Sequence, residues 1–256
     1  MKTNHFLLAA GVSLALAFTF SCSSDGGSKL EEHTFVDIRD NKTYAYVVIG
    51  SQTWMAENLN HAVAGSKCYG GDGEVYGGLN EEAYERIYIT LSAAEVRANC
   101  AKYGRLYDWA TAMNIASTYN GSSYPVSGKH QGVCPNNWHI PSDDEWATLI
   151  NYVESQGGCT YCAGNYLKAK TGWNAYEGIS GNGLDTYGFS ALPGGDGNSY
   201  GYFNDAGDYG NWWSSSEYEI DSDAAYGLFM GYDYEDAARS FGYKTLLLSV
   251  RCVQDW

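Results

Sequence analysis

The chain has 256 residues, and its 30 acidic side chains outnumber its 15 basic ones, which gives a formal net charge of −15 at pH 7. This excess of negative charge argues against a nucleic-acid partner, because nucleic-acid phosphates are held by Lys and Arg. It argues equally against electrostatic docking on anionic lipid. The length is sufficient for a domain with a substantial hydrophobic core.

The N-terminus predicts an exported protein. The apolar run Phe6–Phe20 is short for a membrane span and typical in length for the core of a signal peptide. The small residue Ser21 and then Cys22 follow it, an arrangement that resembles a bacterial lipoprotein signal, in which the cysteine becomes the lipidated first residue. We therefore expect residues 1–21 to be a lipoprotein signal peptide and the Ser- and Gly-rich residues 22–32 to be a flexible tether. The alternative is an ordinary secretory signal with Cys22 incidental.

The first expected elements after the tether are strands. His33–Arg39 alternates in polarity and Thr43–Ile49 is rich in β-branched and aromatic residues, with the turn signal Asp40-Asn41-Lys42 between them. Together these segments predict a β-hairpin. Gln52–Leu59 predicts a short strand and its exit, and residues 65–78, rich in Gly and Asp, predict a loop.

Two helices are expected next. Ser92 followed by Glu95 is a capping box, in which the hydroxyl and the carboxylate each satisfy a free backbone N–H, and it opens a short helix toward Cys100. Residues 104–113 predict a second helix, because four apolar side chains would share one face: Leu106, Trp109, Ala110 and Met113.

The best-marked helix lies near the middle of the chain. Ser142 and Glu145 repeat the capping box, Asp143 and Asp144 add negative charge at the positive end of the helix dipole, and Gly157-Gly158 ends the helix. One apolar face is formed at helical spacing by Trp146, Leu149, Ile150 and Val153.

The remainder of the chain predicts loops and strands. Residues 157–209 are dense in Gly, Asn, Asp and Tyr, which favours loops and short strands, with one helical turn within 164–173. Three short strands are expected at 212–217, 226–230 and 246–253. The change from strand to helix and back to strand predicts an α+β domain.

The cysteines predict disulfides. Of the seven cysteines, six remain once Cys22 is set aside, and an even number in an exported chain indicates a disulfide framework. Sequence alone does not choose among the many pairings of six cysteines. We predict Cys68–Cys100, Cys134–Cys252 and Cys159–Cys162, the second of which would tie the central segment to the C-terminal strand.

The sequence offers little support for an enzyme, because neither its histidines nor its CxxC motif has the pattern of a catalytic or metal site. The histidines outside the signal (His33, His61, His130 and His139) lack the spacing of metal ligands, and His139 is interpreted as a hydrogen-bonded scaffold residue. Cys159-Thr160-Tyr161-Cys162 is a CxxC, but the strand and helix that flank a redox site are not predicted around it, so a structural disulfide is favoured. We expect no catalytic residue and no cofactor.

Acidic residues, whose carboxylates can bind calcium, cluster in the second half of the chain. The clusters are Asn204, Asp205 and Asp208, then Asp221 and Asp223, then Asp233, Glu235 and Asp236. Ca²⁺ needs six to eight converging oxygens, and these clusters lack the EF-hand spacing. We interpret them as solvated loop residues and expect no metal site.

Six blocks of sequence follow one another in an order that resembles a known family, the Fibrobacter succinogenes major paralogous domain. The blocks are Asp37–Asp40 with Tyr46–Leu59, Tyr103–Met113, Cys134–Ser142 with Glu145-Trp146, Gly188–Gly195, Trp212–Glu217 and Ser249–Val253. The resemblance covers roughly residues 34–255, and we assign residues 33–256 to this domain. Members of the family are mostly exported or lipid-anchored bacterial proteins of unestablished function.

The resemblance implies a C-type-lectin-like fold. Such a fold pairs its N- and C-terminal strands, carries two main helices, here near 104–114 and 142–156, and displays a long loop region over a second sheet. Carbohydrate binders and formylglycine-generating enzymes share it, so the fold does not decide the function. The enzymes use a cysteine pair near the C-terminal end, whereas only Cys252 lies late in this chain.

An aromatic loop surface is the candidate that remains. Its expected ligand-binding residues lie in Gly-, Asn- and Asp-rich stretches that this fold exposes: Tyr200, Tyr202, Tyr209, Trp213, Tyr232, Asp233 and Tyr234. Aromatic rings beside amides and acids suit sugar rings or a protein epitope. Trp212 and Trp213 are adjacent and face opposite sides of a strand, so one is expected in the core and the other as a platform. The competing interpretation is that the tyrosines pack the loops onto the sheet.

These observations predict a lipid-anchored, non-enzymatic binding module that engages a glycan or a protein partner. We expect it in the outer membrane of the cell envelope, exposed at the surface and in contact with the membrane only through its N-terminal lipid. The alternatives are a structural or assembly protein without a specific small ligand and, with least support, an enzyme related to the formylglycine-generating fold.

Overall fold

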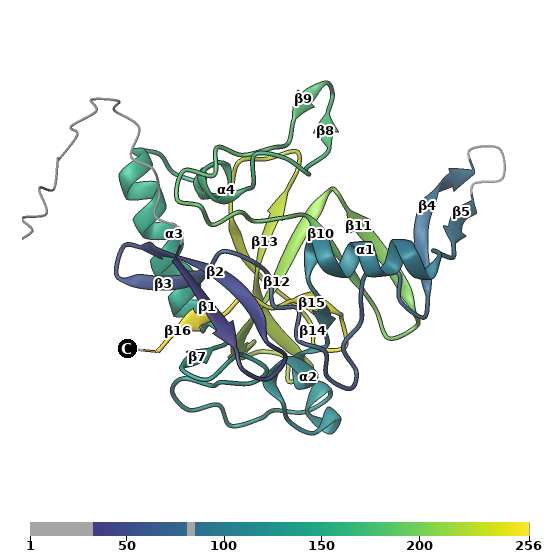
Figure 1. The fold of residues 1–256 in the computed structure, drawn as a ribbon, viewed down its shortest axis with the longest axis horizontal. Helices are drawn as coiled ribbons and strands as arrows, with labels where there is room; N and C mark the ends of the chain where they lie inside the picture. Colours follow the sequence, from purple (N-terminus) through teal and green to yellow (C-terminus); the bar gives the residue numbers. More distant parts are fainter. Residues whose placement is uncertain (1–32, 81–84, 256) are drawn as a thin grey trace, which may run out of the picture.

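A computed structural model describes residues 33–80 and 85–255, and the predicted signal peptide, the tether and Cys22 lie outside these residues. The fold is built mostly from β-sheet, with four short α-helices, so the α+β class is confirmed (Figure 1). The helices are α1 (Ala93–Tyr103), α2 (Trp109–Met113), α3 (Asp143–Gly157) and α4 (Ala163–Leu167). Within residues 33–80 and 85–255, no helix is both long and apolar enough to cross a membrane.

The first sheet joins the two ends of the chain. Its strand order is β1-β2-β3-β16-β7, where the strands are β1 (His33–Asp37), β2 (Lys42–Ile49), β3 (Gln52–Met55), β16 (Val253–Gln254) and β7 (Trp138–His139). Val253 pairs with Trp54 on one side and with His139 on the other, both antiparallel. The N-terminal hairpin and the C-terminal strand therefore lie in one sheet, as the sequence predicts (Figure 1).

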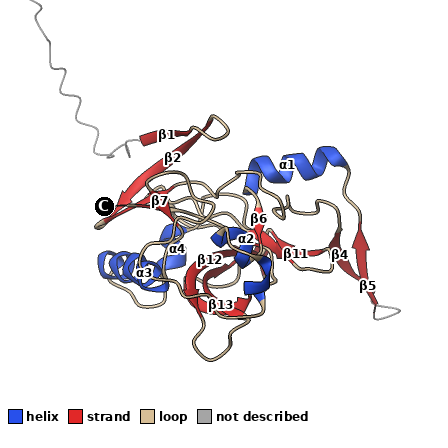
Figure 2. Ribbon diagram, turned by 90° about the horizontal axis from the view of Figure 1, so that it is seen from below, coloured by secondary structure: helices blue, strands red, loops and turns tan. Residues whose placement is uncertain are grey.

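The second sheet is larger and carries the loop region. Its main order is β14-β13-β12-β10-β11-β4-β5, and β15 joins β12 to β6. The strands are β4 (Glu74–Asn80), β5 (Glu85–Ile89), β6 (Leu106–Tyr107), β10 (Gly194–Gly197), β11 (Tyr202–Ala206), β12 (Tyr209–Glu217), β13 (Ala224–Gly231), β14 (Ala238–Tyr243) and β15 (Leu248–Ser249). Figures 1 and 2 both place the β4–β5 hairpin at the opposite end of the molecule from α3.

Two tryptophans on β12 fill two different cores. Trp212 belongs to the cluster that contains Trp54, Trp146 and Phe189, whereas Trp213 belongs to the cluster around Trp109. Both side chains are fully buried because packed elements cover both faces of β12. Trp213 also donates its indole N–H to the Tyr107 carbonyl oxygen at 2.8 Å. The expectation that Trp213 is a ligand platform is therefore wrong.

Both capping boxes are present. Ser142 accepts from the backbone N–H of Glu145 while the Glu145 carboxylate accepts from that of Ser142, and the same exchange joins Ser92 and Glu95. The helix expected over 104–113 is shorter than predicted, because residues 106–107 form β6 and Asp108 caps a helix of only five residues. The two main helices are thus α1 and α3. The helix expected near 142–156 is confirmed as α3, whereas α1 takes the place of the main helix expected near 104–114.

All three predicted disulfides are formed: Cys68–Cys100, Cys134–Cys252 and Cys159–Cys162. The bridge from Cys134 to Cys252 spans 118 residues. It fastens the segment before β7 to the segment before β16, so a covalent bond reinforces the pairing of these two strands. A cross-link over so long a loop restricts the unfolded chain strongly.

Candidate ligand-binding site

Four tyrosine rings gather where β12 begins and β13 ends. Tyr209 opens β12 and faces Gly231 at the end of β13, so the turn that follows places Tyr232 and Tyr234 beside it. Tyr176 approaches from the hairpin of β8 (Ala175–Tyr176) and β9 (Ile179–Ser180), which projects at the top of Figure 1. Ring centroids lie 5.7 Å apart for Tyr176 and Tyr232 and 5.9 Å apart for Tyr209 and Tyr232.

A pocket of about 210 Å³ opens among these rings, and we call it the tyrosine cleft. Its lining combines aromatic faces with polar side chains: Asn165, Lys168, Tyr176, Ile179, Ser180, Asn182, Tyr232, Asp233, Tyr234 and Glu235. Tyr209 packs against Tyr232 and Tyr234 next to this lining. Apolar faces with a few polar groups are the usual make-up of a small-molecule site.

Lys168 holds the turn that carries two of the rings. Its side chain is buried, and Nζ donates to the carbonyl oxygens of Gly231 and Tyr234, both at 2.9 Å. Burial lowers the pKa of this ammonium, while the nearby carboxylates of Glu235 and Asp233 act in the opposite direction. The backbone of the cleft is therefore fixed from below, and this support does not depend on the tyrosine rings.

The β8–β9 hairpin is drawn tightly against the same turn. The Gly181 backbone N–H donates to the Asn174 carbonyl oxygen at 2.9 Å. A Cβ atom at Gly181 would lie 2.3 Å from that oxygen and 2.7 Å from the Tyr232 carbonyl oxygen, so only glycine fits. Close backbone approach thus brings Tyr176 to the cleft.

Asp208 and Asn174 complete the polar border. The Asn174 side-chain amide donates to the Asp208 carboxylate at 2.9 Å, and the Tyr232 backbone N–H donates to the Asp208 carbonyl oxygen at the same distance. Burial raises the pKa of the Tyr232 phenol, and the Asp208 and Asp233 carboxylates raise it further. For Tyr234, burial together with Tyr209 and Asp233 raises the pKa to about 12.

The structure divides the residues expected to bind ligand. Tyr209, Tyr232, Asp233 and Tyr234 come together at the cleft. Tyr202 instead packs on Tyr88 of the β4–β5 hairpin, with 4.6 Å between centroids. Tyr200 also lies away from the cleft, since it is 86% exposed and borders a separate pocket of about 400 Å³.

Sequence reasoning missed several residues that line the cleft, among them Tyr176, Lys168 and Asn182. The Gly-, Asn- and Tyr-rich composition of residues 157–209 predicts a loop region with exposed aromatic residues. It does not predict which of its segments contact one another. No sequence signal singles out Lys168, because it follows the last residue of α4 and has a second lysine, Lys170, two residues later.

Another pocket, about 670 Å³ in volume, lies elsewhere and is bordered by His139, Glu145 and Glu217. His139 is buried, with Nδ1 2.6 Å from an Asp255 carboxylate oxygen and Nε2 2.8 Å from a Glu145 carboxylate oxygen. Because both ring nitrogens are engaged and Glu145 also caps α3, this histidine joins the C-terminus to the helix. Its interpretation as a scaffold residue is confirmed.

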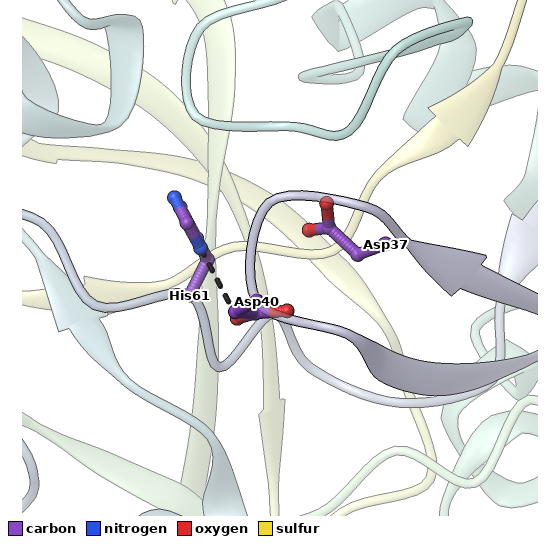
Figure 3. Close-up of side chains that lie close together, drawn as sticks. All are labelled: Asp37, Asp40 and His61. Carbon is purple, nitrogen blue, oxygen red and sulfur yellow. Dashed lines mark hydrogen bonds and ion pairs between the residues drawn. The ribbon is translucent and has the colours of Figure 1, made fainter.

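A second group of titratable residues has the composition of a metal site. Asp37, Asp40 and His61 have ligand atoms within 4.8 Å of one another. Figure 3 shows His61 directed at Asp40, with 3.1 Å between Nδ1 and the carboxylate. The Asp37 carboxylate already accepts three bonds from the Arg39 guanidinium, at 2.7–3.1 Å. A bound cation would have to displace Arg39, so the group is better suited to fastening the β1–β2 turn.

A partly buried carboxyl group lines another polar pocket, about 350 Å³ in volume, between β10, β11 and β4. Asp196 of β10 lies opposite Asn204 of β11, and Asp205, Tyr76 and Arg86 complete the lining. Burial, assisted by the Asp205 charge, raises the pKa of Asp196 to about 7. This carboxyl group consequently changes its charge near neutral pH.

The geometry can be set beside known proteins. A search of curated proteins and a search of solved structures both found no match. The family model described as the Fibrobacter succinogenes major domain matches residues 47–254, which extend from β2 to β16 and include every residue of the tyrosine cleft. The chain therefore belongs to the Fibrobacter succinogenes major domain family.

Proposed function

We propose that this protein is a non-enzymatic binding module whose tyrosine cleft holds one unit of a glycan. The observation that carries the proposal is the convergence of Tyr176, Tyr232 and Tyr234 on one pocket with amide, hydroxyl and carboxylate side chains at its border. Aromatic faces cover the apolar face of a sugar ring, and the polar groups bond its hydroxyls. At about 210 Å³ the cleft is small beside typical ligand pockets of about 300–1,000 Å³, so it suits a single unit of a longer chain.

Two further features support binding rather than catalysis. All six cysteines in residues 33–80 and 85–255 are paired in disulfides, which leaves no thiol for chemistry of the formylglycine-generating kind. The cleft is also built on rigid supports, since the Lys168 ammonium and Asp208 hold its backbone. A preorganised surface loses little entropy when it binds a ligand.

The C-type-lectin-like fold is part of the same proposal. It is supported by the shared sheet of the N- and C-terminal strands, the two main helices α1 and α3, and the long loop region ahead of β12. An experimental structure that fails to superpose on C-type-lectin-like domains over both sheets would contradict it.

Replacing Tyr232→Ala together with Tyr234→Ala is expected to weaken glycan binding more than about tenfold, because two aromatic faces are removed from the cleft. The fold should persist, since Lys168 bonds the backbone of this turn rather than its rings. Glycan-array screening followed by calorimetry with the best-bound oligosaccharide measures the effect.

The matched control is Tyr200→Ala with Tyr202→Ala, which also removes two tyrosines but leaves the cleft intact. We expect this pair to bind as the unchanged protein does. Binding that is lost in the control and kept in the cleft variant would place the site elsewhere. Absence of glycan binding combined with concentration-dependent self-association in sedimentation would favour a structural or assembly role instead.

We further propose that lipidated Cys22 anchors this module to the outer membrane at the cell surface, through the Ser- and Gly-rich residues that follow it. The support is the layout of the N-terminal sequence. Metabolic labelling with a fatty acid should tag the protein, and Cys22→Ala should abolish the tag. Labelling that survives the substitution would contradict the anchor.

A further inference from the structure

Exposed negative charges outnumber positive charges around the tyrosine cleft. Asp233 and Glu235 line the pocket and are exposed, and Asp208 stands at its border. The cation in the lining is Lys168, whose ammonium is buried and already bonded to two carbonyl oxygens. A ligand that enters the cleft therefore meets carboxylates at the surface, while the ammonium below them is already engaged by the Gly231 and Tyr234 carbonyl oxygens.

The rings are arranged for a cation as well as for a sugar. The planes of Tyr176 and Tyr232 meet at 88°, and those of Tyr209 and Tyr232 meet at 80°. Tyr176 and Tyr232, which both line the pocket, therefore turn their negative ring faces in different directions. A cation within about 6 Å of a ring centroid is attracted to that face by about 0.5–2 kcal/mol, depending on its desolvation.

The pKa values of the tyrosine phenols are consistent with negative charge at the cleft. Burial is the main reason why the pKa of Tyr209 is raised, and the carboxylates of Asp233, Asp205 and Asp208 add to it. The Tyr232 phenol is affected by the same acids in the same direction. Negative charge disfavours a phenolate and favours a bound ammonium for one electrostatic reason.

From this geometry we infer that the unit bound in the tyrosine cleft carries a positively charged amine, as the sugar ring of a deacetylated hexosamine polymer does. The inference rests on the proposed function and narrows its ligand class. The aromatic faces would take the ring and its ammonium, Asp233 and Glu235 would pair with the charge, and Ser180, Asn182 and Asn165 would bond the hydroxyls.

The charge selectivity can be separated from binding itself. The probes are three oligosaccharides of equal length: β-1,4-linked glucosamine, its N-acetylated form and the corresponding glucose oligomer. Calorimetry should show the glucosamine oligomer binding about tenfold more tightly than the two neutral oligomers at low salt, and this preference should shrink as salt rises.

Asp233→Asn with Glu235→Gln should remove the preference, so that the variant binds the glucosamine oligomer no more tightly than the two neutral oligomers. The matched control, Glu74→Gln with Glu85→Gln, removes two exposed charges from the β4–β5 hairpin and should keep the preference. A preference that is lost in the control would reflect overall charge and would overturn the inference.

Two results distinguish a failure of the amine selectivity from a failure of the proposed glycan site. Equal binding of the three oligomers, weakened by Tyr232→Ala with Tyr234→Ala, would refute the selectivity for an amine and leave the glycan site standing. Binding of none of the three would overturn the inference, and a glycan array without a cleft-dependent ligand would overturn the glycan site itself. A lysine-rich peptide that binds more tightly than the glucosamine oligomer would also contradict the assignment to a sugar.

Discussion

Arg251→Met is expected to lower the free energy of unfolding by about 3–5 kcal/mol, because it leaves buried acceptors without a donor. In a domain of this size such a loss corresponds to a fall in Tm of roughly 10 °C. Denaturant titration followed by tryptophan fluorescence, with the disulfides intact, measures the change.

The reason lies in the surroundings of the guanidinium, which is fully buried with neutral partners. Its Nε and Nη2 donate to the Asn58 side-chain oxygen at 3.2 and 2.8 Å, and Nη1 donates to the Phe189 carbonyl oxygen. The group also lies 4.3 Å from the centroid of the Phe189 ring and 5.8 Å from that of Trp212. Burial lowers the pKa of Arg251 to about 9, although Asp185 and Glu57 oppose the shift.

Two comparisons make this prediction specific. Arg251→Lys keeps the charge but presents a single ammonium, which cannot match the planar set of donors, so it should also destabilise the fold. Arg97→Met changes an exposed arginine on α1 and should shift the stability by no more than about 0.5 kcal/mol. An Arg251→Met protein as stable as the control would show that the guanidinium does not hold the segment around Phe189.

The second large effect depends on pH. The pKa of Asp196 is raised from 3.8 to about 7, chiefly by burial, so the folded state holds a proton that the unfolded chain releases. The stability associated with this proton is fully present below about pH 4 and is lost as the pH rises through about 7. Asp196→Asn mimics the protonated form and should therefore stabilise the protein above pH 7, by on the order of 3 kcal/mol.

Denaturation at pH 4 and at pH 8 provides the measurement, and the variant and the unchanged protein should nearly coincide at the lower pH. Asp72→Asn serves as the control, since it removes an exposed carboxylate whose pKa is lowered by its bond to Lys67. The control should show no gain at pH 8. An Asp196→Asn protein with no gain at pH 8 would mean that this carboxyl group ionises normally in the folded state.

Local chemistry made part of the fold predictable. Ser142 with Glu145 and Ser92 with Glu95 identified the starts of both main helices, because a capping box satisfies backbone donors within a few residues of the sequence. The hairpin around Asn41 was predictable for a similar reason, since this residue takes the left-handed conformation that turns require. The three disulfides were also predicted, although the sequence allowed other pairings.

Features that depend on distant partners were not predictable. The β4–β5 hairpin contains Gly77 and Gly78 and has an irregular register there, so its sequence resembles that of a loop, and its pairing with β11 supplies the order. Residues 106–107 were expected in a helix but form a strand, because β15 is available to pair with them. Tertiary pairing overrides weak local preference in both cases.

The candidate site likewise combines residues that could be predicted from local sequence with residues that depend on distant contacts. The tyrosines after β13 could be proposed from composition, but Tyr176 reaches them only because Gly181 lets two backbones touch. Trp213 and Tyr232 both lie in aromatic- and Gly-rich sequence, yet the first is enclosed between two layers and the second borders a pocket. Whether each of these side chains is buried depends on the packing of the whole second sheet. It therefore cannot be predicted from a short segment of sequence.

The position of β16 between β3 and β7 has a consequence for how the protein is made. Val253 must meet Trp54, so the first sheet stays incomplete until the chain has been synthesised as far as residue 253. Contacts so far apart in the chain slow the search for the native state, and strands with open edges persist meanwhile. Until residue 253 is available, β3 and β7 lack the strand that lies between them, so this half of the fold cannot close.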